Sequence, residues 1–184
     1  AQNLYFVPIG LFGISYSTAL FPRLNKSYLA RNGEAFFQEF FFGIRTLFLW
    51  LVPSSVLFLV LRAHIVRAAL GAGSFSWEDT RLTAAALAAF VCAMIGGGLL
   101  PLLIKAFYAI ERTWAPFFIT IFSSILTVVV ALTIASGIST DSSLLRNAAG
   151  NLFRIADLPS IAVLGLPIGF AIGVVVNAVL LYLS

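Results

Sequence analysis

Residues 82–104 read LTAAALAAFVCAMIGGGLLPLLI and contain no charged side chain. A helix needs about 20 apolar residues to cross the hydrocarbon core of a bilayer, so this stretch is long enough to span one. Four more uncharged stretches occur, at 1–22, 46–61, 113–140 and 158–184. Only 46–61 is short, and apolar residues that precede it extend the predicted helix back to residue 36. The sequence therefore predicts five spanning helices, over 1–22, 36–61, 82–104, 113–138 and 158–183, in one transmembrane domain of residues 1–184.

The composition supports the same fold class. Of the 184 residues, 61% are hydrophobic and 10% are charged, and the mean hydropathy is +1.05, which excludes an ordinary water-soluble domain. In such a chain the net charge of +4 belongs to loops that face anionic lipid headgroups, so we expect membrane lipids and no nucleic acid as partners. We predict an all-α, polytopic transmembrane helix bundle. Because the chain starts without methionine and stops in an apolar run, we interpret it as a fragment.

The residue inventory argues against an enzyme. His64 is the only histidine, and the single cysteine, Cys92, lies inside an apolar run. No pair of acidic residues falls inside a predicted span, and no glycine-rich phosphate loop follows a strand. We therefore expect no catalytic residue, no cofactor and no metal site.

Proline and glycine interrupt several of the predicted spans. Pro8, Pro53, Pro101 and Pro167 lie inside them, and Gly96, Gly97 and Gly98 precede Pro101. These residues predict kinked helices. Two interpretations stay open: neighbouring helices re-satisfy the backbone, or the kinks let one half of a transporter rock against the other.

Two stripes of small and polar residues follow helical spacing. Gly165, Gly169 and Gly173 share one face of the last predicted helix, which favours close packing of another helix, and Asn177 extends that face and is expected to hydrogen-bond across it. In the first predicted helix Asn3 and Ser17 belong to a stripe that repeats every seven residues through Gly10. This second stripe faces either a wet cavity or a neighbouring helix.

Two ionisable residues, Glu39 and Arg45, lie near or inside the second predicted span. They point about 240° apart around a helix, so they cannot pair along it. An ionisable group inside a span marks a functional pathway by default, which favours contact between Arg45 and an anionic substrate. Arg45 has a second interpretation as an anchor that extends to the lipid headgroups.

Lysines and arginines in the connectors bear on orientation. One side of the membrane would carry Arg23, Lys26, Arg31, Lys105 and Arg112, and the other Arg62, Arg67, Arg81, Arg146 and Arg154. The two sets are equal in number, and Arg45 tips the balance only faintly toward a cytoplasmic location for the first. The second and fourth connectors, from 62 to 81 and from 139 to 157, are long enough for short interfacial helices.

The order of short motifs resembles the MurJ/MviN family of lipid II flippases, within the multidrug/oligosaccharidyl-lipid/polysaccharide exporter superfamily. Residues 8–24, PIGLFGISYSTALFPRL, resemble one helix of that family, and Gly43-Ile-Arg45 followed by Pro53-Ser54 resembles the next. Residues 65–75, IVRAALGAGSF, with Asp79-Thr80, are similar to its glycine-rich loop, and Phe107-Tyr108-Ala109 with Thr113 and Pro116 to a later turn. The motifs cover residues 8–116, and the chain would correspond to the eighth to twelfth helices of the family.

The resemblance implies a function. It implies a multi-pass protein of the bacterial inner (cytoplasmic) membrane that flips lipid II, or another polyprenyl-pyrophosphate-linked glycan, by alternating access, with proteins of cell-wall synthesis as further partners. Asn3, Ser17 and Arg45 are the residues that we expect to contact the substrate headgroup or cavity water. The alternatives are a polysaccharide-unit flippase, a cation-coupled multidrug exporter, or a non-transporting membrane scaffold of cell-wall synthesis.

Overall fold

The computed structural model describes residues 2–70, 77–139 and 165–184. Every regular element in these ranges is a helix, and five helical stretches are long and apolar enough to cross a membrane. These stretches are Asn3–Leu29, Gly33–Val60, Leu82–Ala109, Trp114–Ile134 and Gly165–Leu183. The prediction of an all-α bundle with five spanning helices is confirmed.

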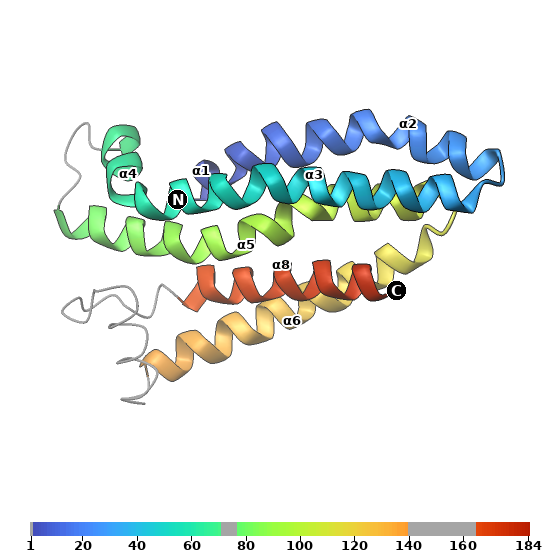
Figure 1. Ribbon diagram of the computed structural model, residues 1–184. Coiled ribbons are helices and arrows are strands. Elements are labelled where there is room, and N and C mark those ends of the chain that lie inside the picture. The colour runs from blue at the N-terminus through green and yellow to red at the C-terminus, as the bar shows by residue number, and fades with distance from the viewer. Residues whose placement is uncertain (1, 71–76, 140–164) are drawn as a thin grey trace.

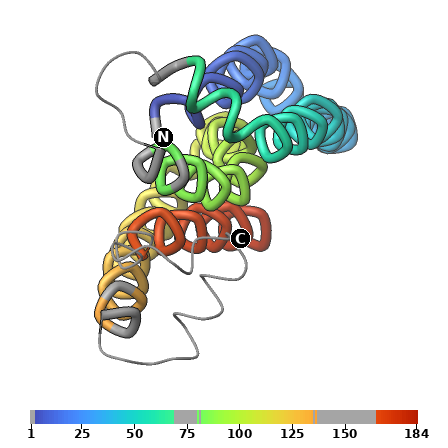
Figure 2. The backbone as a smooth tube through the Cα atoms, turned by 90° about the vertical axis from the view of Figure 1, so that its left-hand side faces the viewer, coloured from blue at the N-terminus to red at the C-terminus, as the bar shows by residue number. Residues whose placement is uncertain are grey.

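The bundle is built around one central helix (Figures 1 and 2). Its elements are α1 (Gln2–Pro8), the π-helix η1 (Ile9–Ile14), α2 (Ser15–Leu29), α3 (Gly33–Val60), α4 (Arg62–Leu70), α5 (Trp77–Ala109), α6 (Trp114–Ser139) and α8 (Gly165–Leu183). Helix α5 contacts every other element, whereas α6 packs mainly on α8 and only weakly on α5. Helix α8 therefore lies between α5 and α6, although α5 and α6 are consecutive in the described chain.

Three consecutive glycines allow α5 to occupy the centre. A Cβ atom on Gly96 would lie 3.4 Å from the Cα atom of Val175 in α8, and one on Gly97 would lie 2.3 Å from the Tyr5 hydroxyl of α1. A Cβ atom on Gly98 would lie 2.4 Å from the Leu51 side chain of α3. Successive residues of a helix point about 100° apart, so each glycine admits a different neighbour. The helix assignment runs without a break through these glycines and Pro101.

The first span contains the one break in regular α-helix among the spans. Pro8 ends α1 and the π-helix η1 follows it directly. Proline has no backbone N–H and its ring crowds the preceding turn, which favours a local change of helix type. Gly13 in η1 then approaches the backbone of α5, since a Cβ atom there would lie 2.7 Å from the carbonyl oxygen of Gly98.

Two turns at the same end of the bundle have the same geometry. Helix α2 ends with Arg31 N–H donating to Tyr28 and Asn32 N–H to Ser27, and α5 ends with Glu111 N–H donating to Tyr108 and Arg112 N–H to Phe107. Arg31 and Glu111 have φ angles of 53° and 61°, the left-handed conformation of a Schellman cap. Glycine usually occupies this position, so both turns carry a charged residue where backbone strain disfavours it.

The helices extend past the uncharged stretches of the sequence. Helix α2 continues through Pro22 and Arg23 to Leu29, and α5 continues through Lys105 to Ala109. The helix expected in the second connector is present as α4. The interfacial helix expected between 139 and 157 lies outside the described residues, apart from Ser139.

The glycine stripe of α8 packs against α6, as its spacing predicts. A Cβ atom on Gly169 would lie 2.5 Å from the Cα atom of Ala131, and one on Gly173 would lie even closer to the Thr127 side chain. The Ser123 hydroxyl donates to the carbonyl of Gly173 across this contact, at 2.8 Å. Asn177 continues the stripe and is buried, but its Oδ1 atom has no hydrogen-bond partner among the described residues, so the expected bond through this oxygen is not formed.

Candidate substrate-contact surface

Asn3 and Ser17, which the sequence places on one stripe, occupy different environments. Asn3 is exposed, whereas Ser17 is fully buried and its hydroxyl donates to the carbonyl of Ile14 at 3.0 Å. The seven-residue repeat assumes 3.6 residues per turn, and the intervening π-helix has wider turns that shift the register. The two residues therefore do not share one environment, and of the two interpretations that stayed open, the burial of Ser17 among the described residues favours a neighbouring helix.

Arg45 lies on the outer face of α3. The buried residues of α3 are Gly43, Leu47, Leu51 and Ser55, and Arg45 points about 160° away from Gly43 and Leu47, its neighbours two residues away. Its side chain is exposed. Glu39 of the same helix pairs instead with Arg23 of α2, at 3.8 Å. The structure does not bring Arg45 together with Asn3 or Ser17.

Lys105 makes a polar contact within the bundle that the sequence did not indicate. Its ammonium donates to the hydroxyl of Thr18 in α2, and that hydroxyl donates in turn to the carbonyl of Ile14 at 2.7 Å. Lys105 is partly buried and Thr18 is exposed. The pair therefore places a cation inside an apolar span, with its position fixed by a hydroxyl on the neighbouring helix.

Further hydroxyl groups lie on the side of α5 that faces α6, and we group them with this pair under the name polar furrow. A cavity of about 480 Å³ lies between α5 and α6, and its lining includes Tyr108 of α5 with Thr120 and Ser124 of α6. Ile104 and Tyr108 of α5 line this cavity. Going around α5 from these two residues, Lys105 comes next, and its ammonium contacts Thr18. We define the furrow by Thr18, Lys105, Tyr108, Thr120 and Ser124. It offers one cation and four hydroxyl groups.

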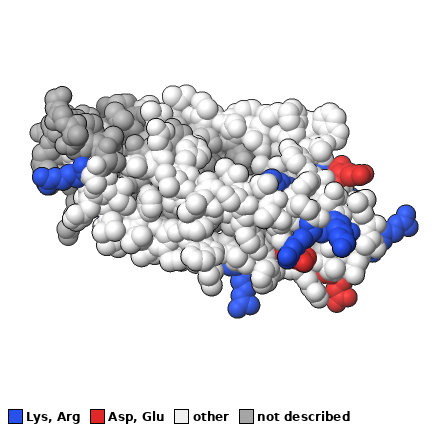
Figure 3. Space-filling model, turned by 90° about the horizontal axis from the view of Figure 1, so that it is seen from above, with Lys and Arg blue, Asp and Glu red and all other residues white. Residues whose placement is uncertain are grey.

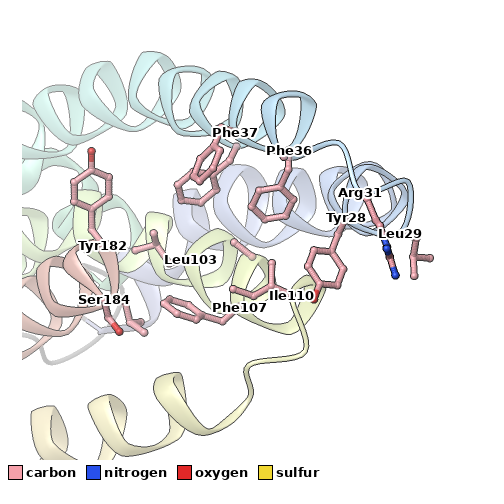
Figure 4. Close-up of a pocket in the computed structure, with 14 residues that line it drawn as sticks. Tyr28, Leu29, Arg31, Phe36, Phe37, Leu103, Phe107, Ile110, Tyr182 and Ser184 are labelled. Atoms are coloured by element: carbon pink, nitrogen blue, oxygen red, sulfur yellow. The ribbon is translucent and has the colours of Figure 1, made fainter.

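A larger groove beside α3 is almost entirely apolar. It has a volume of about 890 Å³ and lies between the ends of α2 and α3, the end of α5, and the end of α8. Figure 4 shows Phe36 of α3, Phe107 of α5 with Ile110 just after that helix, and Tyr182 of α8 around one space, with Arg31 at its rim. An apolar cavity of about 550 Å³ between α3, α5 and α8 shares Leu103 and Tyr182 with it. Such a surface suits acyl chains or another helix and offers little to a charged ligand.

Charged side chains gather at one end of the molecule. On the face in Figure 3, most lysine, arginine and acidic side chains lie toward the end with the α2–α3 turn, and the rest of the face is mostly uncharged. Exposed Trp114 stacks on Phe118 at the start of α6, at the same end. Aromatic residues of this kind are enriched where a membrane meets water. Among the described residues, no group of three or more His, Cys, Asp or Glu could hold a metal ion.

Five apolar helices packed through glycines, with charges collected at the helix ends, define a multi-pass membrane protein. The model of one protein family, described as lipid II flippase MurJ, matches residues 1–184. The chain belongs to this family, and the resemblance inferred from its motifs is confirmed.

Individual relatives agree with the family match. The chain is 27% identical over 128 residues to a probable lipid II flippase MurJ of Borreliella burgdorferi, covering 70% of this chain and 25% of that protein. It is 32% identical over 126 residues to one of Thermotoga maritima, covering 67% and 25%. It is 26% identical over 117 residues to the lipid II flippase MurJ of Thermosipho africanus, covering 64% and 24%. The chain thus spans about a quarter of the length of these relatives, and no solved structure matches it.

Proposed function

We propose that this chain works as part of a lipid II flippase, which moves the lipid-linked peptidoglycan precursor across the bacterial inner (cytoplasmic) membrane by alternating access. The family match over the whole chain carries the proposal, and the names of the relatives support it. Because the chain spans about a quarter of those relatives, transport would belong to the complete protein.

The chemistry of this task fits the surfaces of the chain. A flippase breaks no covalent bond, so it has to bind the polar headgroup, shield it from hydrocarbon and release it on the other side. A pyrophosphate is bound best by cations and hydrogen-bond donors in a low-dielectric setting. The polar furrow supplies such groups, while the polyprenyl tail stays among lipids. Asn3, Ser17 and Arg45 stay predicted contacts; Asn3 and Arg45 are exposed, and Ser17 is buried.

The proposal includes an orientation, in which the end with the α2–α3 and α5–α6 turns faces the cytoplasm. Arg112 and His64 are exposed at opposite ends of the bundle. In a Cys92→Ser background of the full-length protein, Arg112→Cys should resist a membrane-impermeant maleimide added outside, whereas His64→Cys should react. Reaction of Arg112→Cys alone would reverse the orientation.

Transport is tested by complementation with the full-length protein that contains this chain. In a bacterium depleted of its own lipid II flippase, the protein should restore growth and the exposure of lipid II on the outer leaflet. A membrane protein of unrelated function, expressed at the same level, serves as the control. Absence of lipid II exposure at normal membrane levels would reject the proposed function.

A further inference from the structure

We propose that Lys105, held by Thr18, is an anion-binding residue that contacts a phosphate oxygen of the lipid-linked substrate. The inference rests on the proposed function, and names the group in this chain that would recognise the headgroup. It starts from a cation in a place where cations are costly. Lys105 lies inside the span Leu82–Ala109, and an ionisable side chain in such a position is usually tied to a pathway or a partner.

The ammonium of Lys105 is only partly satisfied. A lysine ammonium has three N–H donors, and the structure gives this one a single acceptor, the Thr18 hydroxyl. Within the described part of the chain it has no carboxylate partner. A hydroxyl is neutral, so the positive charge stays uncompensated and two donors stay available to an anion.

The direction of the side chain argues against a lysine that only extends to the headgroup layer. Lys105 is one turn before the end of α5, so its stem could carry the ammonium past the end of the helix. The ammonium lies instead against Thr18, about 16 Å along the axis from Leu29 at the end of α2. Thr18 is itself oriented by its bond to Ile14, which leaves its oxygen lone pairs for Lys105.

The surroundings of the pair suit a phosphate ester with polar substituents. Tyr108, Thr120 and Ser124 continue the polar furrow on the side of α6, and Thr18 and Tyr108 are exposed. Hydroxyl groups can bind both phosphate oxygens and sugar hydroxyls. The groove beside α3 also carries polar groups, which are Arg31 at its rim and the hydroxyls of Tyr28, Tyr182 and Ser184. The polar furrow differs from it in having a cation inside a span.

The test measures binding and transport in the full-length protein. Purified protein in phosphatidylcholine nanodiscs is titrated with lipid II and, separately, with phosphatidylglycerol, and the same variants are assayed by complementation. Losing a charge-assisted hydrogen bond should weaken lipid II binding about tenfold in Lys105→Ala, and Lys105→Arg should restore part of it. Thr18→Val should weaken binding less, since it removes the hydroxyl that positions the ammonium but keeps the cation. Arg112→Ala, which removes an exposed cation at the same end, should bind normally.

Each outcome decides the proposal. Weaker lipid II binding by Lys105→Ala with unchanged phosphatidylglycerol binding and thermal stability supports it. Equal losses for both lipids would assign Lys105 to bilayer phosphates, and a lower melting temperature with unchanged binding would assign it to a carboxylate elsewhere in the protein; either result overturns it. If the wild-type protein transports lipid II and Lys105→Ala binds and transports it equally well, this inference is rejected but the proposed function is not. Wild-type protein that neither binds nor exports lipid II rejects the proposed function and the inference with it.

Discussion

Lys105 and Arg45 lie at nearly the same level of the bundle, yet their helices treat them differently. Gly43 of α3 faces both Leu20 of α2 and Leu102 of α5, which puts these three residues at one level. Arg45 and Lys105 each lie within one turn of it, about 8 Å apart along the bundle axis. Lys105 is partly buried against Thr18, whereas Arg45 is exposed on the outer face of α3. The two cations differ because Lys105 lies on a helix face that a neighbouring helix partly covers, whereas Arg45 lies on an outer face.

The largest expected effect comes from breaking the contact of α8 with α6, the helix that carries Thr120 and Ser124 of the polar furrow. Gly169→Leu places a bulky side chain where even a Cβ atom would lie 2.5 Å from the Cα atom of Ala131. We expect overpacking to destabilise the protein by about 3 kcal/mol, seen as a lower melting temperature in detergent. Gly10→Leu is the matched control, because nothing lies within 4 Å of a Cβ atom there. Normal stability with lost transport would instead place Gly169 on the transport pathway.

A smaller loss of stability is expected from a substitution that moves η1 and α2 away from α5 and so disturbs Lys105 but not Arg45. Gly13→Ala adds a Cβ atom 2.7 Å from the Gly98 carbonyl oxygen, so one backbone has to shift. We expect a loss of about 2 kcal/mol in the free energy of unfolding and weaker lipid II binding, since Thr18 moves with α2. Gly10→Ala on the same π-helix should leave both quantities unchanged. If Gly13→Ala melts normally, the close approach of η1 to α5 does not hold the bundle together.

The difference between the two cations also marks what the sequence could predict. Five spans follow from the length of apolar stretches, which is a local property. The ends of the helices do not follow from this property. Lys105 is the first charge after 82–104 and was therefore assigned to a connector, but in the structure its helix continues for another turn. Its partner Thr18 is distant in the sequence, and only the packing of α2 on α5 brings the two together.

The candidate site was less predictable than the fold. Ser17 was placed on a polar stripe by a seven-residue repeat that the π-helix interrupts, so its burial could not be read from spacing. Residue type gave Arg45 correctly as an ionisable group in a span, but spacing alone did not reveal which face of α3 would be covered. The glycine stripe of α8 was predictable, because small residues four apart require a close neighbour whatever its identity.

A modest effect is expected at the turn that joins α2, which carries Thr18, to α3, which carries Arg45. The side chain of Asn32 accepts a hydrogen bond from the backbone N–H of Ala35 at 3.0 Å and so caps α3. Asn32→Ala should cost about 1 kcal/mol of stability, whereas Asn32→Asp keeps an acceptor and should cost less. Because α3 stays packed on α5, lipid II binding per folded molecule should not change in either variant. A selective loss of binding in Asn32→Ala would mean that this turn itself contacts the substrate.

The smallest effect on transport is expected at Arg45, and it decides between the two interpretations of that residue. On the outer face of α3 a cation can extend to lipid headgroups, a role that needs positive charge but not the planar guanidinium. Arg45→Lys should therefore complement like the wild type, and Arg45→Ala should lower the amount of protein in the membrane more than the lipid II export per molecule. Headgroup recognition predicts instead that export per molecule also falls in Arg45→Lys, because a lysine cannot form the bidentate contact of an arginine with pyrophosphate. Reduced export per molecule in both variants, with lysine the milder, would restore Arg45 as a substrate contact and require that a part of the protein outside this chain closes over the outer face of α3.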